Sequence, residues 1–209
     1  MALPKEPRQK MINIMYLVLT ALLAINISAE ILNAFKTINE SLEKTNTAVN
    51  ASTTQILASL TQKLNDPATR DRASVWKPKA DQVSSYAKET FDYLENLKKE
   101  IITASSKGGK LKEDEQNATT RILVKEGKGK QLYELLKRYK ENVLKTDEKI
   151  NTEFVNSFAV NLDPPKSQNS NKKTWEEAYF YMAPAVGVLS ILSKFQNDVR
   201  TSENKVVTF

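Results

Sequence analysis

The sequence contains no cysteine and no histidine. Without cysteine the chain has no disulfide framework and no thiol chemistry. Without histidine it lacks the commonest general base and the commonest metal ligand. Residues 125–130, KEGKGK, combine glycine and lysine but lack the spacing of a phosphate-binding loop, so they predict a solvated turn. We therefore expect no enzyme, no cofactor and no bound metal.

The chain also lacks the strong charge imbalance of a nucleic-acid-binding protein. Its net charge is +6, and residues 1–10, with three bases and one acid, supply +2 of this. The remaining +4 predicts a mildly basic solvated surface and no nucleic-acid partner. Only 5 glycines, with 40% hydrophobic and 27% charged residues, suit helices joined by polar loops.

One long uncharged segment, residues 11–29, follows the basic start. It contains no glycine or proline, and its 19 residues approach the roughly 20 that a membrane helix needs. The positive-inside rule then places residues 1–10 in the cytoplasm and residues 30–209 in the periplasm. We therefore predict a single-pass protein of the inner membrane, in contact with its lipid.

A cleaved signal peptide is the alternative interpretation of this segment. The apolar run is longer than the usual signal core of about 7–15 residues. Ile27 also stands where a small residue is preferred before a cleavage site. The helical pattern continues past Ala29. These features favour a retained membrane helix.

Apolar and small side chains continue at three- and four-residue spacing beyond the predicted membrane segment. This pattern predicts one continuous helix, from about Arg8 to Leu64, that pairs with another helix along its length. The predicted seam consists of Ala24, Ser28, Ile31, Phe35, Ile38, Leu42, Thr45, Val49, Ser52, Ile56, Leu57, Leu60 and Leu64.

The rest of the chain predicts further helices. A second helix follows Pro67 and contains Pro78, which either kinks it or marks its start. We expect helices over 131–145 and 149–158, and a short docked segment at 122–124. A capping box at Thr174 opens a last helix.

Pro184 predicts a bend in this last helix, and residues 206–209 predict either a domain edge or a strand. The fold class we predict is all-α: one N-terminal transmembrane helix continuing into an antiparallel periplasmic helical bundle over residues 30–209.

Polar residues form a stripe on one side of the predicted membrane helix. Gln9, Asn13, Tyr16 and Thr20 recur at helical spacing, which favours packing against other membrane helices. The alternative is that Asn13 and Thr20 bond their own backbone. Arg8 lies at the cytoplasmic edge, where it either pairs with a partner's carboxylate or reaches lipid head groups. No acid or histidine lies in the segment, so a proton-relay group must belong to a partner.

Four sequence blocks resemble the GldM/PorM family. They are residues 7–20 (PRQKMINIMYLVLT), 28–35 (SAEILNAF), 173–177 (KTWEE) and 192–200 (LSKFQNDVR). The first two resemble the start of that family, and the last two resemble its first periplasmic domain.

The resemblance implies an inner-membrane component of the type IX secretion and gliding machinery. It implies a homodimer whose membrane helices lie inside a ring of GldL/PorL-like subunits, in a motor driven by the proton-motive force. The arginine matching Arg8 would meet a carboxylate of that ring, and Gln9, Asn13, Tyr16 and Thr20 would contact it. Family members continue into β-rich domains that reach an outer-membrane-associated ring, so we expect this sequence to be a piece of a longer protein.

Two other functions stay open from the residues alone. A static scaffold or sensor would use the membrane helix only as an anchor, although no second apolar run of about 18 residues supports a return through the membrane. An exported soluble bundle would have a mature N-terminus near Glu30.

Overall fold

A computed structural model shows a chain that is helical almost throughout, which confirms the all-α class. It describes residues 7–25, 28–165 and 174–209, with side chains for these except 20–25. The helices are α1 (Pro7–Ile25), α2 (Ala29–Lys63), α3 (Arg70–Ala104), α4 (Asn117–Thr120), the π-helix η1 (Arg121–Lys125), α5 (Lys128–Lys145), α6 (Glu148–Phe154), α7 (Trp175–Phe180) and α8 (Ala185–Thr208). The strands β1 (Ser106–Lys107) and β2 (Lys110–Leu111) form an antiparallel hairpin.

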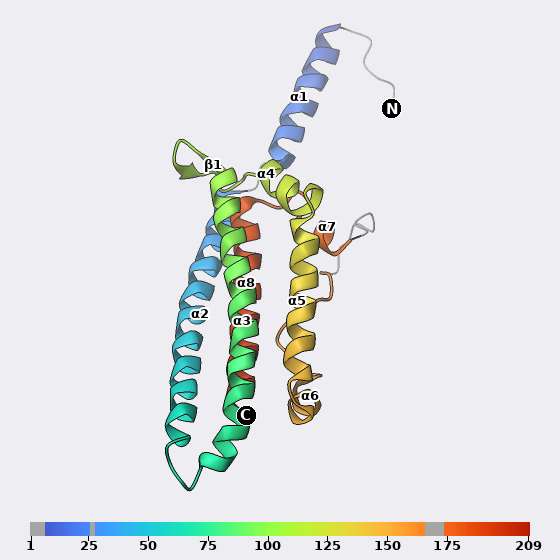
Figure 1. Ribbon diagram of the computed structural model, residues 1–209. Helices are drawn as coiled ribbons and strands as arrows, with labels where there is room; N and C mark the ends of the chain where they lie inside the picture. Colours follow the sequence, from blue (N-terminus) through green and yellow to red (C-terminus); the bar gives the residue numbers. More distant parts are fainter. Residues whose placement is uncertain (1–6, 26–27, 166–173) are drawn as a thin grey trace.

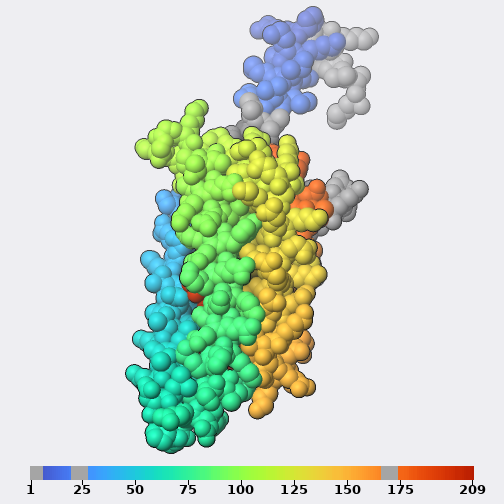
Figure 2. Space-filling model, viewed as in Figure 1, coloured from blue at the N-terminus to red at the C-terminus, as the bar shows by residue number. Residues whose placement is uncertain are grey.

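Helices α2, α3 and α8 pack together lengthwise, and α5 packs on the other side of α3 (Figure 1). Helix α1 extends beyond one end of this bundle, and the C-terminus lies toward the other end (Figure 1). Helices α2, α3 and α5 form one face, behind which α8 is almost hidden (Figure 2). The core combines leucines from three helices, including Leu94, Leu136 and Leu192, all fully buried.

The predicted antiparallel arrangement is correct for only some helix pairs. Ion pairs join Lys128 to Glu100 and Arg138 to Glu89, so α5 runs opposite to α3. Helices α2 and α8 are parallel, because Ser190 bonds Phe35 near their N-termini while Asn204 bonds Ser52 farther along both. The reason is topological: after α6 the chain returns to the α1 end of the bundle before α8 begins.

The predicted continuous helix from Arg8 to Leu64 is wrong. Helix α2 begins at Ala29, and Ser28 before it is extended, with φ −66° and ψ 147°. The Ile31 N–H donates both to the Ser28 hydroxyl and to the Ser28 carbonyl, so Ser28 caps the start of the helix with its side chain and its backbone. A serine that can cap a helix thus overrides a helical pattern that runs past it.

The heptad spacing of α2 is confirmed, but at four positions of the predicted seam the next residue along the chain faces the bundle instead. Phe35, Leu42, Val49 and Ile56 face the bundle as predicted. The alternate positions are not the predicted Ile31, Ile38, Thr45 and Ser52, which are exposed, but Leu32, Asn39, Asn46 and Thr53. Hydrogen bonds to α8 offset the cost of burying the three polar residues.

Pro78 lies inside α3, so it does not mark that helix's start. The predicted capping box is present at Thr174 and Glu177, and it opens α7. The bend predicted at Pro184 is a complete break, since Pro184 is the N-cap of α8. Residues 206–208 are helical, which rules out the predicted strand there.

Among the described residues, no helix is both long and apolar enough to cross a membrane. The predicted membrane segment, residues 11–29, therefore stays a prediction. Helix α1 covers its first part, and residues 26–27 lie outside the described residues.

Candidate functional site

Helix α1 carries the residues predicted to bind partner membrane helices. Arg8, Gln9, Asn13 and Tyr16 are all exposed, and the side chain of Thr20 lies outside the described residues. At 3.6 residues per turn, Gln9, Asn13, Tyr16 and Thr20 share one side of the helix, and Arg8 lies beside that stripe. The large apolar side chains of α1 whose placement is described are also exposed: Met11 (74%), Ile12, Ile14, Met15, Leu17 (71%), Val18 and Leu19.

Helices α2 and α8 are joined by polar side chains, which we call the polar seam: Asn39, Asn46, Thr53, Ser193, Asn197 and Asn204. The Ser193 hydroxyl donates to the side-chain Oδ1 of Asn39 over 2.6 Å, and the Asn197 side-chain amide donates to Oδ1 of Asn46 over 3.1 Å. The Asn204 amide donates to Thr53 over 3.1 Å. Polar partners at alternate positions fix the register of two parallel helices, because a shift would leave them unpaired.

Lys98 of α3 is the ion at the centre of this interface and is only 6% exposed. Its ammonium donates to Glu43 of α2 over 2.8 Å, and to Ser193 and Gln196 of α8 over 2.9 and 3.3 Å. Burial alone would raise the pKa of Glu43, but the hydrogen bond and charge of Lys98 hold that pKa below its usual value. One side chain thus connects three helices.

A second buried polar group joins α3, α5 and α8. Glu203 is 1% exposed and accepts from Ser84 over 2.7 Å and from Arg200 over 2.9 Å. The Tyr139 hydroxyl donates to the Val199 carbonyl, and burial raises the pKa of Tyr139. Ser84, Arg200, Glu203 and Tyr139 each form a hydrogen bond within the bundle, so we assign this group to the stability of the bundle.

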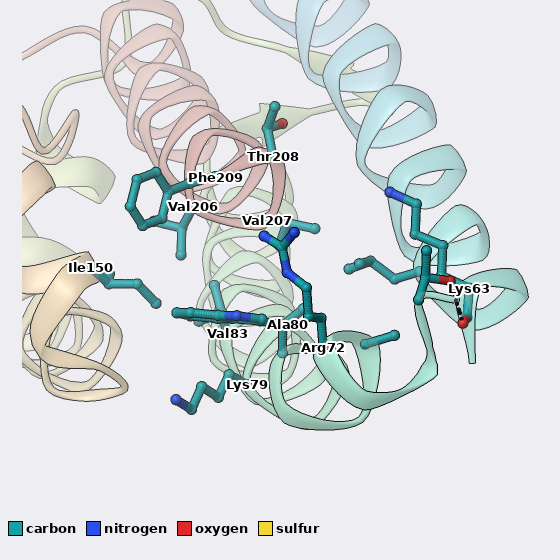
Figure 3. A pocket seen from close by; sticks show the side chains of 14 residues that line it. Lys63, Arg72, Lys79, Ala80, Val83, Ile150, Val206, Val207, Thr208 and Phe209 are labelled. Atoms are coloured by element: carbon teal, nitrogen blue, oxygen red, sulfur yellow. Dashed lines mark hydrogen bonds between the residues drawn. The ribbon is translucent and has the colours of Figure 1, made fainter. Parts of the chain in front are cut away.

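A pocket of about 280 Å³ opens at the bundle end farthest from α1, between the α2–α3 turn, α6 and the end of α8. Its apolar lining includes Trp76, Val83, Ile150, Val206 and Phe209. The ionisable side chains that line it are all cations: Lys63, Arg72 and Lys79. In Figure 3 the Arg72 side chain reaches into the space below Val206 and Val207, while Lys79 points outward.

The ions around Trp76 are partly paired. Lys79 lies 4.6 Å from the centre of the Trp76 ring and forms an ion pair with Asp147, whose pKa is lowered mainly by this hydrogen bond. Lys149 lies 5.9 Å from the same ring. The side chains of Lys63 and Arg72 have no ion-pair or hydrogen-bond partner among the described residues. No local sequence signal predicts this pocket, because its residues lie far apart in the chain.

Within the described residues, no group of three or more acidic side chains could hold a metal ion. Three features are therefore candidates for function. They are the exposed side chains of α1, the polar seam, and the pocket lined by Lys63, Arg72 and Lys79, which we call the basic pocket.

The family model of the GldM N-terminal domain matches residues 30–208. The chain belongs to this family. It is therefore a component of the gliding and type IX secretion machinery, and the predicted family is confirmed. The GldM family is associated with the inner membrane and is a structural or motor component. No curated protein matches the chain.

The GldM match begins at Glu30, within the first turn of α2, and ends within the last turn of α8. The polar seam and the basic pocket thus lie in the matched domain, whereas α1 precedes it. The predicted roles of Arg8, Gln9, Asn13, Tyr16 and Thr20 stay predictions.

Proposed function

We propose that this GldM-family chain is the rotor or lever of a motor driven by the proton-motive force. Helix α1 lies in the inner membrane with its N-terminus in the cytoplasm, inside a ring of GldL/PorL-like subunits. Two copies pair, and the α2–α8 bundle carries their motion into the periplasm. Further domains pass it to an outer-membrane-associated ring.

The exposed apolar surface of α1 is the observation that carries this proposal. Seven large apolar side chains between Met11 and Leu19 are 43–74% exposed, which is far more apolar surface than a soluble protein leaves in contact with water on one helix. Lipid and partner helices would cover it. The stripe of Gln9, Asn13 and Tyr16 gives partner helices a polar face to bind.

The exposed heptad positions of α2 support pairing of two copies. Ile31 and Ile38 are 51% and 50% exposed, although they lie seven residues apart on one side of the helix. The α2–α8 interface occupies the neighbouring side, so these isoleucines are available to a second α2. A parallel pair of copies would bury them against each other.

The first experiment tests Arg8 against a neighbouring cation. Arg8→Ala should stop gliding and secretion while the chain still copurifies with its ring protein, because the guanidinium meets a ring carboxylate. Lys10→Ala is the matched control, since it removes the same charge from the same segment, and it should retain function. Equal loss in both variants would reduce Arg8 to a topology signal, and normal gliding of Arg8→Ala would remove it from the mechanism.

A second experiment uses the absence of native cysteine in this chain. A cysteine at Asn13 should cross-link to the ring protein, whereas one at Val18, on the opposite side of α1, should not. A static scaffold or sensor would expose both positions to lipid. In that case a lipid-phase reagent should label both cysteines equally, and neither should form a protein cross-link. A mature N-terminus near Glu30 would favour the exported bundle.

A further inference from the structure

The geometry of the basic pocket points to a binding site for an acidic peptide segment of a protein partner. We propose that one large apolar side chain of that segment enters the pocket, while carboxylates beside it pair with Arg72 and Lys63. This inference does not depend on the motor role of α1, because it uses only the bundle end farthest from α1.

The charge of the lining selects for anions. Among the described side chains, three cations and no acidic side chain line the pocket, whereas a second hollow between α3 and α5 includes Glu89 and Glu134 as well as Lys130 and Arg138. Asp147 satisfies Lys79, but Arg72 and Lys63 have no partner among the described side chains. A ligand carboxylate would therefore form new charge-assisted hydrogen bonds without displacing existing ones.

The size of the pocket suits one large apolar side chain. Its volume of about 280 Å³ lies at the lower limit of the roughly 300–1,000 Å³ of common small-molecule sites, and its lining includes Trp76, Val83 and Ile150. A peptide can place one apolar side chain in the pocket, as an anchor side chain does at a protein interface.

The test uses the chain of residues 1–209 in detergent and isothermal titration calorimetry. The probe is a capped seven-residue peptide with a central phenylalanine between pairs of aspartates. The peptide should bind the unmodified chain. Arg72→Glu or Lys63→Glu should weaken peptide binding about tenfold or more, because each replaces a cation that would hydrogen-bond a peptide aspartate by an anion that repels it. Lys44→Glu, on the exposed side of α2, is the matched control and should change binding little.

Two control ligands separate the parts of the proposal. Replacing the phenylalanine by glycine should abolish binding, as should replacing the aspartates by lysines. Equal binding of the glycine peptide would reduce the site to general charge attraction and overturn the proposal. Absence of peptide binding, or binding of laurate in its place, would also overturn it. Circular dichroism would establish that the three charge variants fold, which is expected since all three side chains are exposed.

Discussion

Lys98→Met would measure what the buried ion at the centre of the bundle contributes to stability. Methionine keeps most of the length of the lysine stem but removes the ammonium group, which has partners on both α2 and α8. Because Lys98 is 6% exposed, water cannot replace the lost donor at Ser193 and Gln196.

The magnitude follows from how exposed each partner is. An unsatisfied buried acceptor costs about 1–3 kcal/mol, and Lys98→Met leaves two acceptors short of a donor. The Ser193 hydroxyl keeps its hydrogen bond to Asn39, so its cost lies at the lower end. The Gln196 Oε1 loses its donor, because the bond that Gln196 keeps is donated by its Nε2 to Glu95. The Glu43 side chain is 50% exposed and rehydrates, so its pair adds only about 0–1 kcal/mol. The free energy of unfolding should fall by about 2 kcal/mol.

Thermal unfolding followed by circular dichroism would measure this change. A loss of about 2 kcal/mol lowers the Tm by about 4–8 °C for a chain of this size. Lys99→Met is the matched control, since the neighbouring lysine is exposed, and it should change stability by less than about 0.5 kcal/mol.

The pH dependence gives a second, independent readout. The folded-state pKa of Glu43 lies below its ordinary value, so its pair with Lys98 stabilises the fold above that ordinary value, about 4.3. This part of the stability is lost as pH falls through the folded pKa. The difference between the unmodified chain and Lys98→Met should therefore shrink in acid. A neutral or stabilising Lys98→Met would refute the reasoning, since a well-packed apolar residue would then serve as well as the ion.

Two further variants test the packing of the bundle by the same unfolding assay. Gly129→Ala should cost about 1–3 kcal/mol, because a Cβ there would lie 2.6 Å from both the Glu176 Cβ and the Leu123 carbonyl oxygen; a stability change near zero would mean that α7 shifts freely. Burial raises the pKa of Asp198 despite its bond to Lys194, so ionising this carboxyl costs more in the folded chain than in the unfolded one. Asp198→Asn should therefore leave the Tm unchanged or raise it, and a clear drop would contradict this.

Helix positions could be predicted from the sequence because capping and periodicity are local signals. The capping box at Thr174 depends on residues three apart, and it is present as predicted. The burial of Leu132, Leu136 and Val143 follows their helical spacing in the same way.

The face that α2 buries could not be predicted, because it depends on α8, about 150 residues away. Asn46 and Thr53 reach the interface only because Asn197 and Asn204 offer them hydrogen bonds. Hydrophobicity alone favours Ile31 and Ile38 for the same role, and in the single chain these stay exposed. The basic pocket was missed for the same reason, since α2, α3, α6 and α8 each contribute to it.

The break before Ala29 has consequences for how α1 can act on the bundle. A continuous helix would pass bending and rotation directly into α2, whereas an extended Ser28 lets α1 change direction relative to α2. Ser28→Ala removes the capping hydroxyl, at a cost of about 1 kcal/mol, and supplies the strongest helix former in its place. The variant should therefore favour one unbroken helix.

If the motor needs a joint at this point, Ser28→Ala should reduce gliding and secretion while Ser28→Asp, which keeps a capping oxygen, should preserve both. Spin labels can be attached to cysteines at positions 17 and 38, since the chain has no native cysteine. They would report whether the distribution of distances between α1 and α2 narrows to a single value. A variant with that single distance and normal gliding would show that α1 and α2 work as one rod, and the capped break would then have no part in transmission. Reduced gliding with an unchanged distance distribution would instead assign the loss to α2 stability, because only the cap would have been removed.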